Sequence, residues 1–332
     1  MRLSILVVSR TANLLSTMLC SVKNALHLPI REVEILCSWN GSPEEEARIE
    51  NGSGYKFSIA KRIPYHFASN INELANLAKG DILAFVNDDV ILDRNSLDSG
   101  LSCLLDDIST LCVGSLLRMP DGRLQHGGMN FDYHHVPYHI AEGLINAEDV
   151  ISGLPPYEVP CVTGALMLVR KSTFEEQPFD VSYKRCGEDV QLNLDLREKL
   201  KGRVILCPSM SAIHLESATR ATNKETGNIS GDLEKMKTRR RSFIEKASRE
   251  QLKVELSMSA RENLFTKEVM EKERSHLRQQ QAKAKDINYL ESLEQYRDQL
   301  ERDRDHWKDQ AHSLQLTRLK LEQKLKKTQR GA

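Results

Sequence analysis

The chain has 332 residues, with 47 basic and 47 acidic side chains and a formal net charge of zero at pH 7. A chain of this length can hold two domains, or one large domain with an appendage. Because the charges balance, no global field would draw the protein to nucleic acid, and no nucleic-acid partner is expected. No apolar run approaches the ~20 residues that a bilayer span needs.

The seven cysteines are scattered, odd in number and never spaced as CxxC. Several lie within apolar runs, as small core hydrophobes do. This distribution argues against a zinc knuckle or a disulfide framework and favours a reducing cytoplasm. The opening MRLSILVVSR is expected to be a β-strand rather than a secretory signal, because its short apolar run has no small-residue cleavage site.

Residues 1–222 alternate strand-like and helix-like patterns, which is typical of an α/β domain with a mostly parallel sheet. A first strand is predicted over residues 3–8, where LSILVV is a buried-strand run, apolar except for Ser4. The clearest helix is SNINELANLAKGD, whose apolar stripe ends at Gly80, a residue suited to stopping a helix. Further buried strands are predicted over 159–169 and 202–208.

Two adjacent carboxylates follow a strand predicted over residues 82–86. Asp88 and Asp89 interrupt an apolar run that resumes at Val90. Like charges repel, and removing them from water is costly unless a cation or hydrogen-bond donors compensate. A solvated turn would explain them, but ligands of open α/β sheets bind at the carboxyl ends of the strands. The position therefore favours a site for a metal ion and phosphate groups.

Two further clusters carry titratable groups at the ends of predicted elements. Glu188 and Asp189 open a predicted helix. His214 precedes Glu216 and Arg220 after the last predicted strand. Carboxylate oxygens with one imidazole suit Mn²⁺ or Mg²⁺ better than Zn²⁺. Each cluster alone is weak evidence, because paired acids are usually solvated and a single histidine is more often structural. Two alternatives therefore stay open: the clusters converge on one site, or they are separate features of the surface.

The composition changes past residue 240, where proline is absent, glycine is absent up to residue 330 and charges alternate. A helical stalk is predicted over 245–328, after a basic linker over 223–244. An apolar residue recurs every seven positions, at Leu293, Leu300, Trp307, Leu314 and Leu321. The companion positions are mostly polar: Tyr296, Asp303, Gln310, Thr317 and Lys324. We expect a coiled coil that makes the protein a homo-oligomer, and a long solvated helix is the alternative.

The basic run KTRRRS, residues 237–242, lies between the predicted domain and the stalk. Such clusters gain about 1 kcal/mol per basic residue near an anionic leaflet, which would place the protein peripherally at the inner membrane face. An ordinary solvated linker is the alternative.

Five blocks of the sequence occur in the order and spacing of glycosyltransferase family two. They are NINELANLAKGDILAFVNDDV, VGSLLRMPDGRLQHGG, VTGALMLVRKSTFE, GEDVQLNLDLRE and HLESATR. Over about residues 1–222, the chain most resembles the bacterial rhamnosyltransferase-like, surface-polysaccharide branch of that family. The resemblance implies a GT-A fold, a nucleotide-diphosphate sugar donor, a glycan or lipid-linked acceptor, and inversion at the anomeric carbon.

The resemblance also assigns roles to the titratable residues. Asp89 would hold the divalent cation that bridges the diphosphate, and His214 would complete its coordination. Asp189 resembles the general base, with Glu188 as its support or as the rival for that role.

Donor-binding positions follow from the same resemblance. Asp88 would touch the ribose or the water shell of the metal, and Arg220 would steady the leaving diphosphate. Thr163 and Gly164 match the loop that lines the sugar pocket. The other positions that the resemblance places near the donor are Ser9, Arg10, Trp39, Asn40 and Asn72. His126 fits a family position near the donor sugar, although an isolated histidine is more often structural.

Some residues depart from the family pattern. Trp39 stands where relatives commonly carry an acid that recognises the base, so Trp39 either stacks on the base or belongs to the core. Gln177 and Pro178 replace a pair of glycines on the acceptor side. These departures keep open a second hypothesis, a catalytically silent GT-A protein that binds sugars or acts as a scaffold. A nucleotidyltransferase is less favoured, because no glycine-rich phosphate loop follows the first strand.

Overall fold

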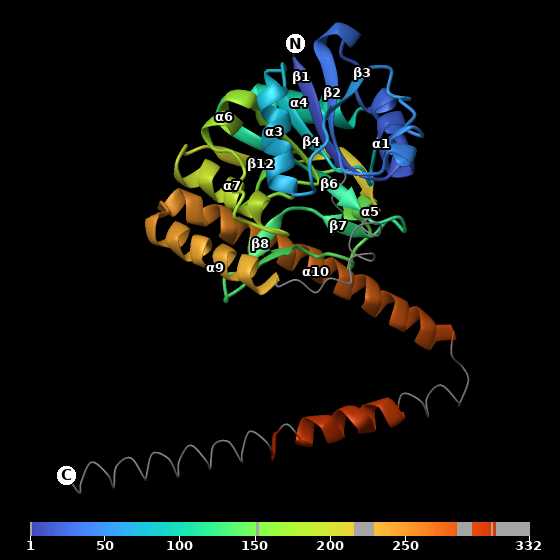
Figure 1. Cartoon of the computed structure of the whole chain (residues 1–332). Helices are drawn as coiled ribbons and strands as arrows, with labels where there is room; N and C mark the ends of the chain where they lie inside the picture. The colour runs from blue at the N-terminus through green and yellow to red at the C-terminus, as the bar shows by residue number, and fades with distance from the viewer. Residues whose placement is uncertain (1, 151–152, 216–228, 284–293, 307, 310–332) are drawn as a thin grey trace, which may run out of the picture. The chain divides into compact units, whose positions relative to one another are not determined.

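The computed structural model describes residues 2–150, 153–215, 229–283, 294–306 and 308–309. Residues up to Val269 form one compact unit, and those from Met270 on form a second. Figure 1 labels the elements of the chain, whose bounds follow.

The strands are β1 (Leu3–Ser9), β2 (Val33–Trp39), β3 (Lys56–Lys61), β4 (Ile82–Val86), β5 (Val90–Leu92), β6 (Thr110–Arg118), β7 (Leu124–His126), β8 (Met129–Phe131), β9 (Pro137–His139), β10 (Tyr157–Glu158), β11 (Leu166–Arg170) and β12 (Arg203–His214). The helices are α1 (Ala12–Ala25), the 3-10 helix η1 (Ile30–Glu32), α2 (Pro43–Glu46), α3 (Phe67–Leu77), α4 (Ser96–Asp106), α5 (Ala147–Val150), α6 (Lys171–Glu176), α7 (Glu188–Glu198), α9 (Ile229–Lys246) and α10 (Arg249–Lys283). Residues 294–306 are also helical.

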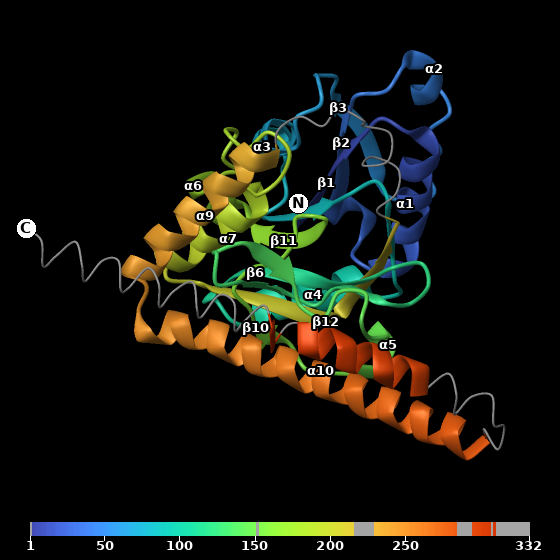
Figure 2. The same cartoon turned by 90° about the horizontal axis from the view of Figure 1, so that it is seen from below.

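Within the described residues, a ten-stranded sheet runs in the order β10-β12-β6-β11-β4-β1-β2-β3, with β5 paired to β12 and β7 to β6. The pairs β1–β2, β1–β4, β2–β3 and β6–β12 are parallel. β11 enters antiparallel between β4 and β6. Parallel neighbours need crossover connections, and the helices that make them lie on both faces of the sheet (Figure 2).

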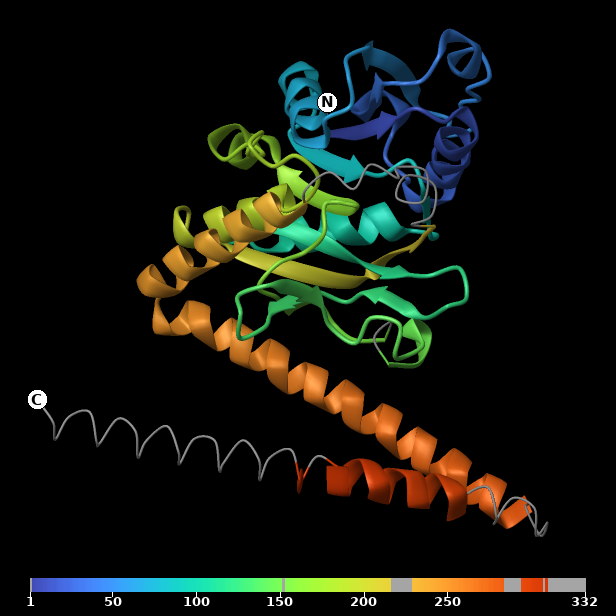
Figure 3. The same ribbon diagram turned by 60° about the horizontal axis from the view of Figure 1, so that its bottom comes forward.

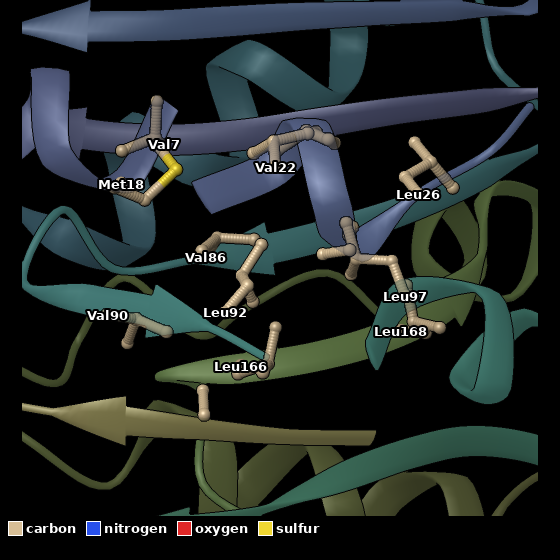
Figure 4. Packing of buried hydrophobic residues seen from close by; sticks show 14 of the residues in the cluster. Val7, Met18, Val22, Leu26, Val86, Val90, Leu92, Leu97, Leu166 and Leu168 are labelled. Atoms are coloured by element: carbon tan, nitrogen blue, oxygen red, sulfur yellow. The ribbon is translucent and has the colours of Figure 1, made fainter. Parts of the chain in front are cut away.

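The core has two layers, one on each face of the sheet. Residues of α1 and α4 pack with Ile5 and Val7 on one face, whereas residues of α3, α6 and α7 pack with Leu6 on the other. Because both faces are covered, β1 and β4 are buried along their whole length, as their largely apolar runs predicted. Figure 4 shows the first layer, with Val7 and Val86 of the sheet near Met18 of α1.

The basic linker expected over 223–244 is wrong from Ile229 on, where helix α9 begins. Phe243 of α9 is fully buried in a cluster with Val190 of α7. Met258 and Phe265 of α10 join the main core. The compact unit therefore extends to Val269, well beyond the boundary expected at residue 222. Figure 3 shows orange α9 beside yellow-green α7, as Figure 1 does.

Two arginines of the basic run point into the protein. Because arginine is usually exposed, a sequence pattern that contains them predicts a solvated linker. Arg240 is buried, pairs with Glu255 of α10 and lies with its guanidinium carbon 4.4 Å from the centre of the Phe131 ring. Arg239 pairs with Asp195 at 2.7 Å and with a second acid of α7 at 2.6 Å. These two arginines are occupied by protein acids, so the hypothesis of a lipid contact through this run loses much of its support.

The stalk is described only in part. Leu300 is 51% exposed on its helical segment. The heptad positions Leu293, Trp307, Leu314 and Leu321 lie outside the described residues, so the coiled coil stays a prediction. Among the described residues, no helix combines the length and the apolar character that a membrane crossing requires.

Candidate active site

The candidate site lies where strands β1, β2 and β4 end. These strands are parallel, so their carboxyl ends meet at one edge of the sheet. Ser9 closes β1, Trp39 closes β2, and Asp88 follows β4 after one residue. Polar groups that are far apart in the sequence are thereby brought to the edge at which open α/β sheets bind ligands.

Asp89 and His214 meet because the short strand β5 pairs antiparallel with the end of β12. Val90 lies opposite His214, and the backbone N–H of Leu215 donates to the carbonyl of Asp89 at 3.0 Å. The His214 Nε2 lies 3.1 Å from the Asp89 Oδ1, and both side chains are largely buried. The predicted convergence of these two residues is what the geometry shows.

Gln125 orients the imidazole, and nothing in the sequence marks it for this role beyond its place beside His126. The Gln125 Oε1 lies 2.9 Å from the His214 Nδ1, which must donate to this oxygen. In the neutral imidazole the His214 Nε2 then turns its lone pair toward Asp89, whereas in the protonated ring it donates to Asp89. Two electron-pair donors 3.1 Å apart require a proton or a cation between them.

This pair fits a divalent ion. Two ligands at ~2.1 Å and at right angles on an octahedral ion lie about 3 Å apart, close to the observed separation. In the described part of the chain, no group of three or more His, Cys, Asp or Glu residues could hold a metal. Mg²⁺-type ions commonly bind through one or two protein ligands together with substrate phosphates, so two protein ligands are sufficient.

Asp88 lies beside the end of β1, where its Oδ2 accepts a 2.6 Å hydrogen bond from the Ser9 hydroxyl. Burial raises the pKa of Asp88 to about 6; the Ser9 hydrogen bond opposes the shift and the charge of Asp89 adds to it. The Arg10 guanidinium is near enough to lower the same pKa. Ser9, Arg10 and Asp88 thus share one corner of the site.

Trp39 is a core residue, only 2% exposed, and its indole N–H donates to the Ser42 carbonyl at 3.4 Å. Its edge still lines a surface cavity of about 470 Å³ together with Arg62. The Asn40 side-chain N–H donates to the Ile63 carbonyl, and its Oδ1 is buried without a partner among the described residues.

The start of α7 brings the second acidic pair to the site. Asp189 Oδ2 accepts from the Gly164 N–H at 3.0 Å, and its Oδ1 accepts from the Val190 N–H at 2.7 Å. Asp189 is therefore tied to the loop of Thr163 and Gly164, two positions to which the resemblance assigns separate roles. Burial raises the pKa of Glu188 to about 8, and the charges of Asp189 and then Asp232 add to this shift.

Tyr65, which sequence reasoning missed, lies near both acidic pairs. Its side chain is 56% exposed in the loop between β3 and α3. Partial burial raises the pKa of Tyr65, and the charges of Glu188, Asp88 and Asp89 raise it further. One phenol in the field of all three carboxylates indicates that they face a common space.

The side chain of Asn72 links two segments of the fold. Its amide N–H donates to the Phe179 carbonyl at 2.8 Å, and its Oδ1 accepts from the Phe179 N–H at 3.1 Å. These bonds tie α3 to the loop after α6, and a donor contact by Asn72 would compete with them. Arg220 and Glu216 lie outside the described residues.

His126 is fully buried behind the Thr163 loop. Its Nε2 accepts from the Thr163 N–H at 3.4 Å, and its Nδ1 lies 2.8 Å from the Nδ1 of His139. Burial holds the pKa of His126 well below its usual range, and nearby His139 and His214 lower it further. The neutral ring of His126 supports the Thr163 loop. This is a structural role, the one expected more often for an isolated histidine.

Comparison with protein families finds no matching family model. Over 216 residues, 63% of this chain, the sequence is 28% identical to the O-antigen biosynthesis protein RfbC of Myxococcus xanthus, and the match covers 17% of that protein. Over 101 residues, 29% of the chain, it is 30% identical to the uncharacterized protein y4gI of Sinorhizobium fredii, and the match covers 11% of that protein. The chain thus spans less than a fifth of these relatives.

The fold is similar to that of the mannosyltransferase PcManGT from Pyrobaculum calidifontis, solved in complex with GDP-Man and Mn²⁺. The TM-score is 0.53 at 13% identity, over 88% of this chain and 78% of that one. The chain therefore has the GT-A fold of glycosyltransferases, and the predicted α/β class is confirmed. A relative in O-antigen biosynthesis agrees with the surface-polysaccharide resemblance that the motifs indicated.

The raised pKa of Glu188 predicts a pH-dependent cost to stability. Because the folded pKa, about 8, exceeds the ordinary value of 4.5, the folded state holds this proton more tightly. The stabilisation that this proton contributes to the folded state is fully present below about pH 4.5 and is lost as the pH rises to 8. The quantity to compare is the melting temperature of Glu188→Gln minus that of wild type. We expect this difference to be at least about 2 °C larger at pH 8.5 than at pH 5.

The measurement is thermal denaturation in EDTA at several pH values. Glu176→Gln, which removes an exposed carboxylate of α6, is the control and should follow the wild-type curve. Parallel curves for Glu188→Gln and wild type would contradict the assignment.

Proposed function

We propose that the protein is an inverting, metal-dependent glycosyltransferase that moves a sugar from a nucleoside-diphosphate donor to a glycan or lipid-linked acceptor in surface-polysaccharide synthesis. The observation that carries this proposal is the buried pair Asp89 and His214, 3.1 Å apart at the carboxyl edge of a GT-A sheet. The relative in O-antigen biosynthesis supports the pathway, and a similar fold with GDP-Man and Mn²⁺ supports the donor class. All seven cysteines are free, which supports a cytoplasmic location.

Asp89 and His214 would hold Mn²⁺ or Mg²⁺, which when bound neutralises the charge that develops on the leaving diphosphate. Asp88 and Ser9, joined by their hydrogen bond, would meet the ribose side of the donor. Arg10 adds a positive charge at the same corner. Trp39 lies behind these groups as a wall rather than as a free stacking ring, because it is buried.

Asp189 is the proposed general base. An acceptor hydroxyl is a poor nucleophile until a carboxylate removes its proton. Two backbone N–H groups hold the Asp189 carboxylate in one direction, and the N-terminus of α7 favours its charged form. Glu188 is the rival for this role: with a pKa of about 8 it carries a proton at pH 7, and once ionised it is a stronger base than an ordinary carboxylate. A single attack assisted by one base inverts the anomeric carbon without a covalent intermediate.

Two substitutions separate metal binding from proton removal. Asp89→Asn should abolish Mn²⁺-dependent binding of UDP, GDP or dTDP, because one of two protein ligands is weakened. Asp189→Asn should keep that binding while turnover of the active sugar nucleotide falls about 10²–10⁴-fold, the usual contribution of a general base.

The assay is nucleoside diphosphate release from UDP-, GDP- and dTDP-sugars with Mn²⁺, alongside calorimetric binding. Asp121→Asn, in the exposed turn between β6 and β7, is the matched control and should behave as wild type. Failure of the intact protein to bind or turn over any of these nucleotides would favour the silent scaffold instead.

We also propose that the residues beyond Val269 assemble the protein as a homo-oligomer through a coiled coil. The support is the heptad of leucine and tryptophan residues, of which Leu300 is half exposed on a helical segment. A protein cut after Val269 should show a lower mass by light scattering. The cut belongs there and not near residue 240, because Phe243 and Phe265 are part of the core.

Leu300→Asn in the full chain is a milder form of the same test, because a polar residue in the seam weakens association. Equal masses for the full chain and the shortened chain would show that this helix does not assemble the protein.

A further inference from the structure

Helix α9 carries a buried carboxylate that the proposed mechanism does not use. Asp232 is 3% exposed, although the sequence placed it in a linker. Its Oδ2 accepts from the backbone N–H groups of Lys184 at 3.0 Å, Arg185 at 2.7 Å and Cys186 at 3.4 Å. Successive N–H groups that converge in this way form an anion-binding concavity, here filled by a side chain of the same protein.

The turn that Asp232 holds leads directly into the acidic pair. Gly187 follows it with a φ of +105°, a conformation that other residues rarely adopt, and α7 begins at the next residue. Glu188 and Asp189 are the first two residues of that helix. The backbone is therefore fixed immediately before the residues proposed to accept the proton.

Met236 closes the same junction one turn farther along α9. A Cβ atom added at Gly187 would lie 2.7 Å from the Met236 Cγ and Sδ, so the two helices approach closely at this point. Near the other end of α7, Arg239 pairs with Asp195 at 2.7 Å. Contacts at both ends of α7 leave α9 little freedom to slide relative to it.

The carboxylate of Asp232 would be costly to bury without these donors. Hydrogen bonds to an ionised acceptor are roughly twice as strong as neutral ones, so the turn and the carboxylate stabilise each other. The Lys235 ammonium lies 3.8 Å away, too far for a hydrogen bond, so the backbone N–H groups are the main partners described for Asp232.

We propose that Asp232 is a positioning residue for the acidic pair Glu188 and Asp189, acting through the backbone of residues 184–186. This inference rests on the proposed function, because it takes Glu188 and Asp189 to be the residues that remove the proton. It makes α9 a functional part of the catalytic unit, in a region outside the blocks that resemble glycosyltransferases.

The test compares Asp232→Asn with Glu234→Gln. Asparagine keeps the size of the side chain but offers one acceptor oxygen and no charge. Glu234 lies on the same helix, is exposed and pairs only with Lys237 among the contacts described, so its substitution is the matched control. Two measurements are made on the full chain: hydrogen–deuterium exchange of the peptide that covers residues 183–189, and nucleoside diphosphate release from the active sugar nucleotide.

Asp232→Asn should raise the exchange rate of that peptide about tenfold, the effect of losing one charge-assisted hydrogen bond. We expect kcat to fall by about the same factor, while KM, the affinity for the nucleotide and the melting temperature change little. Glu234→Gln should change none of these quantities. Met236→Ala, which loosens the junction without touching the carboxylate, should also raise exchange and lower kcat.

Unchanged exchange at residues 183–189 in Asp232→Asn would overturn the inference, as would faster exchange with an unchanged kcat. If Asp232→Asn does not fold, the same criteria apply to Asp232→Glu, which keeps the charge but moves the carboxylate away from the N–H groups of residues 184–186. If the wild-type protein turns over no sugar nucleotide, the proposed function fails, and exchange alone then decides whether Asp232 fixes the turn.

Discussion

The pairing of β5 with the end of β12 is the constraint on which the site depends. β12 lies beside β6 along its length, but its other neighbour changes from β10 to β5 as it approaches His214. A register shift between Cys207 and Ser211 accompanies this change. The ladder then places His214 opposite Val90, so the imidazole meets the carboxylate of Asp89, which lies far away in the sequence. Without that strand pairing, the acids at the end of β4 would be a solvated turn, as the simplest reading of the sequence allowed.

Around this pair the fold concentrates negative charge where solvent cannot fully compensate for it. Burial raises the pKa of Asp88 to about 6 and that of Glu188 to about 8. Buried carboxylates that resist ionisation are concentrated at functional sites. A divalent ion and a basic corner at Arg10 would relieve the repulsion. The same cost explains why backbone N–H groups hold the carboxylates of Asp189 and Asp232.

Much of this arrangement could be predicted from the sequence. Continuous apolar runs revealed strands buried on both faces, and acids directly after such a strand indicated the ligand-binding edge. The residues that could not be predicted are those whose partners come from tertiary contacts. Gln125 carries no signal in the sequence that it orients His214. The sequence predicts a linker over α9 because its buried positions include Asp232, which accepts from backbone N–H groups, and Arg240, which pairs with Glu255. A hydropathy pattern counts such residues as exposed.

In the proposed mechanism, a metal site on the sheet acts together with a proton acceptor on α7, which α9 holds in place. That mechanism requires Asp89 and His214 to hold one divalent ion together. Diffraction at the manganese absorption edge, from crystals of the full chain grown with Mn²⁺ and GDP or UDP, tests this requirement. We predict an anomalous peak at about 2.0–2.3 Å from both the Asp89 carboxylate and the His214 Nε2. A peak elsewhere, with these two side chains still in direct contact with each other, would contradict the account.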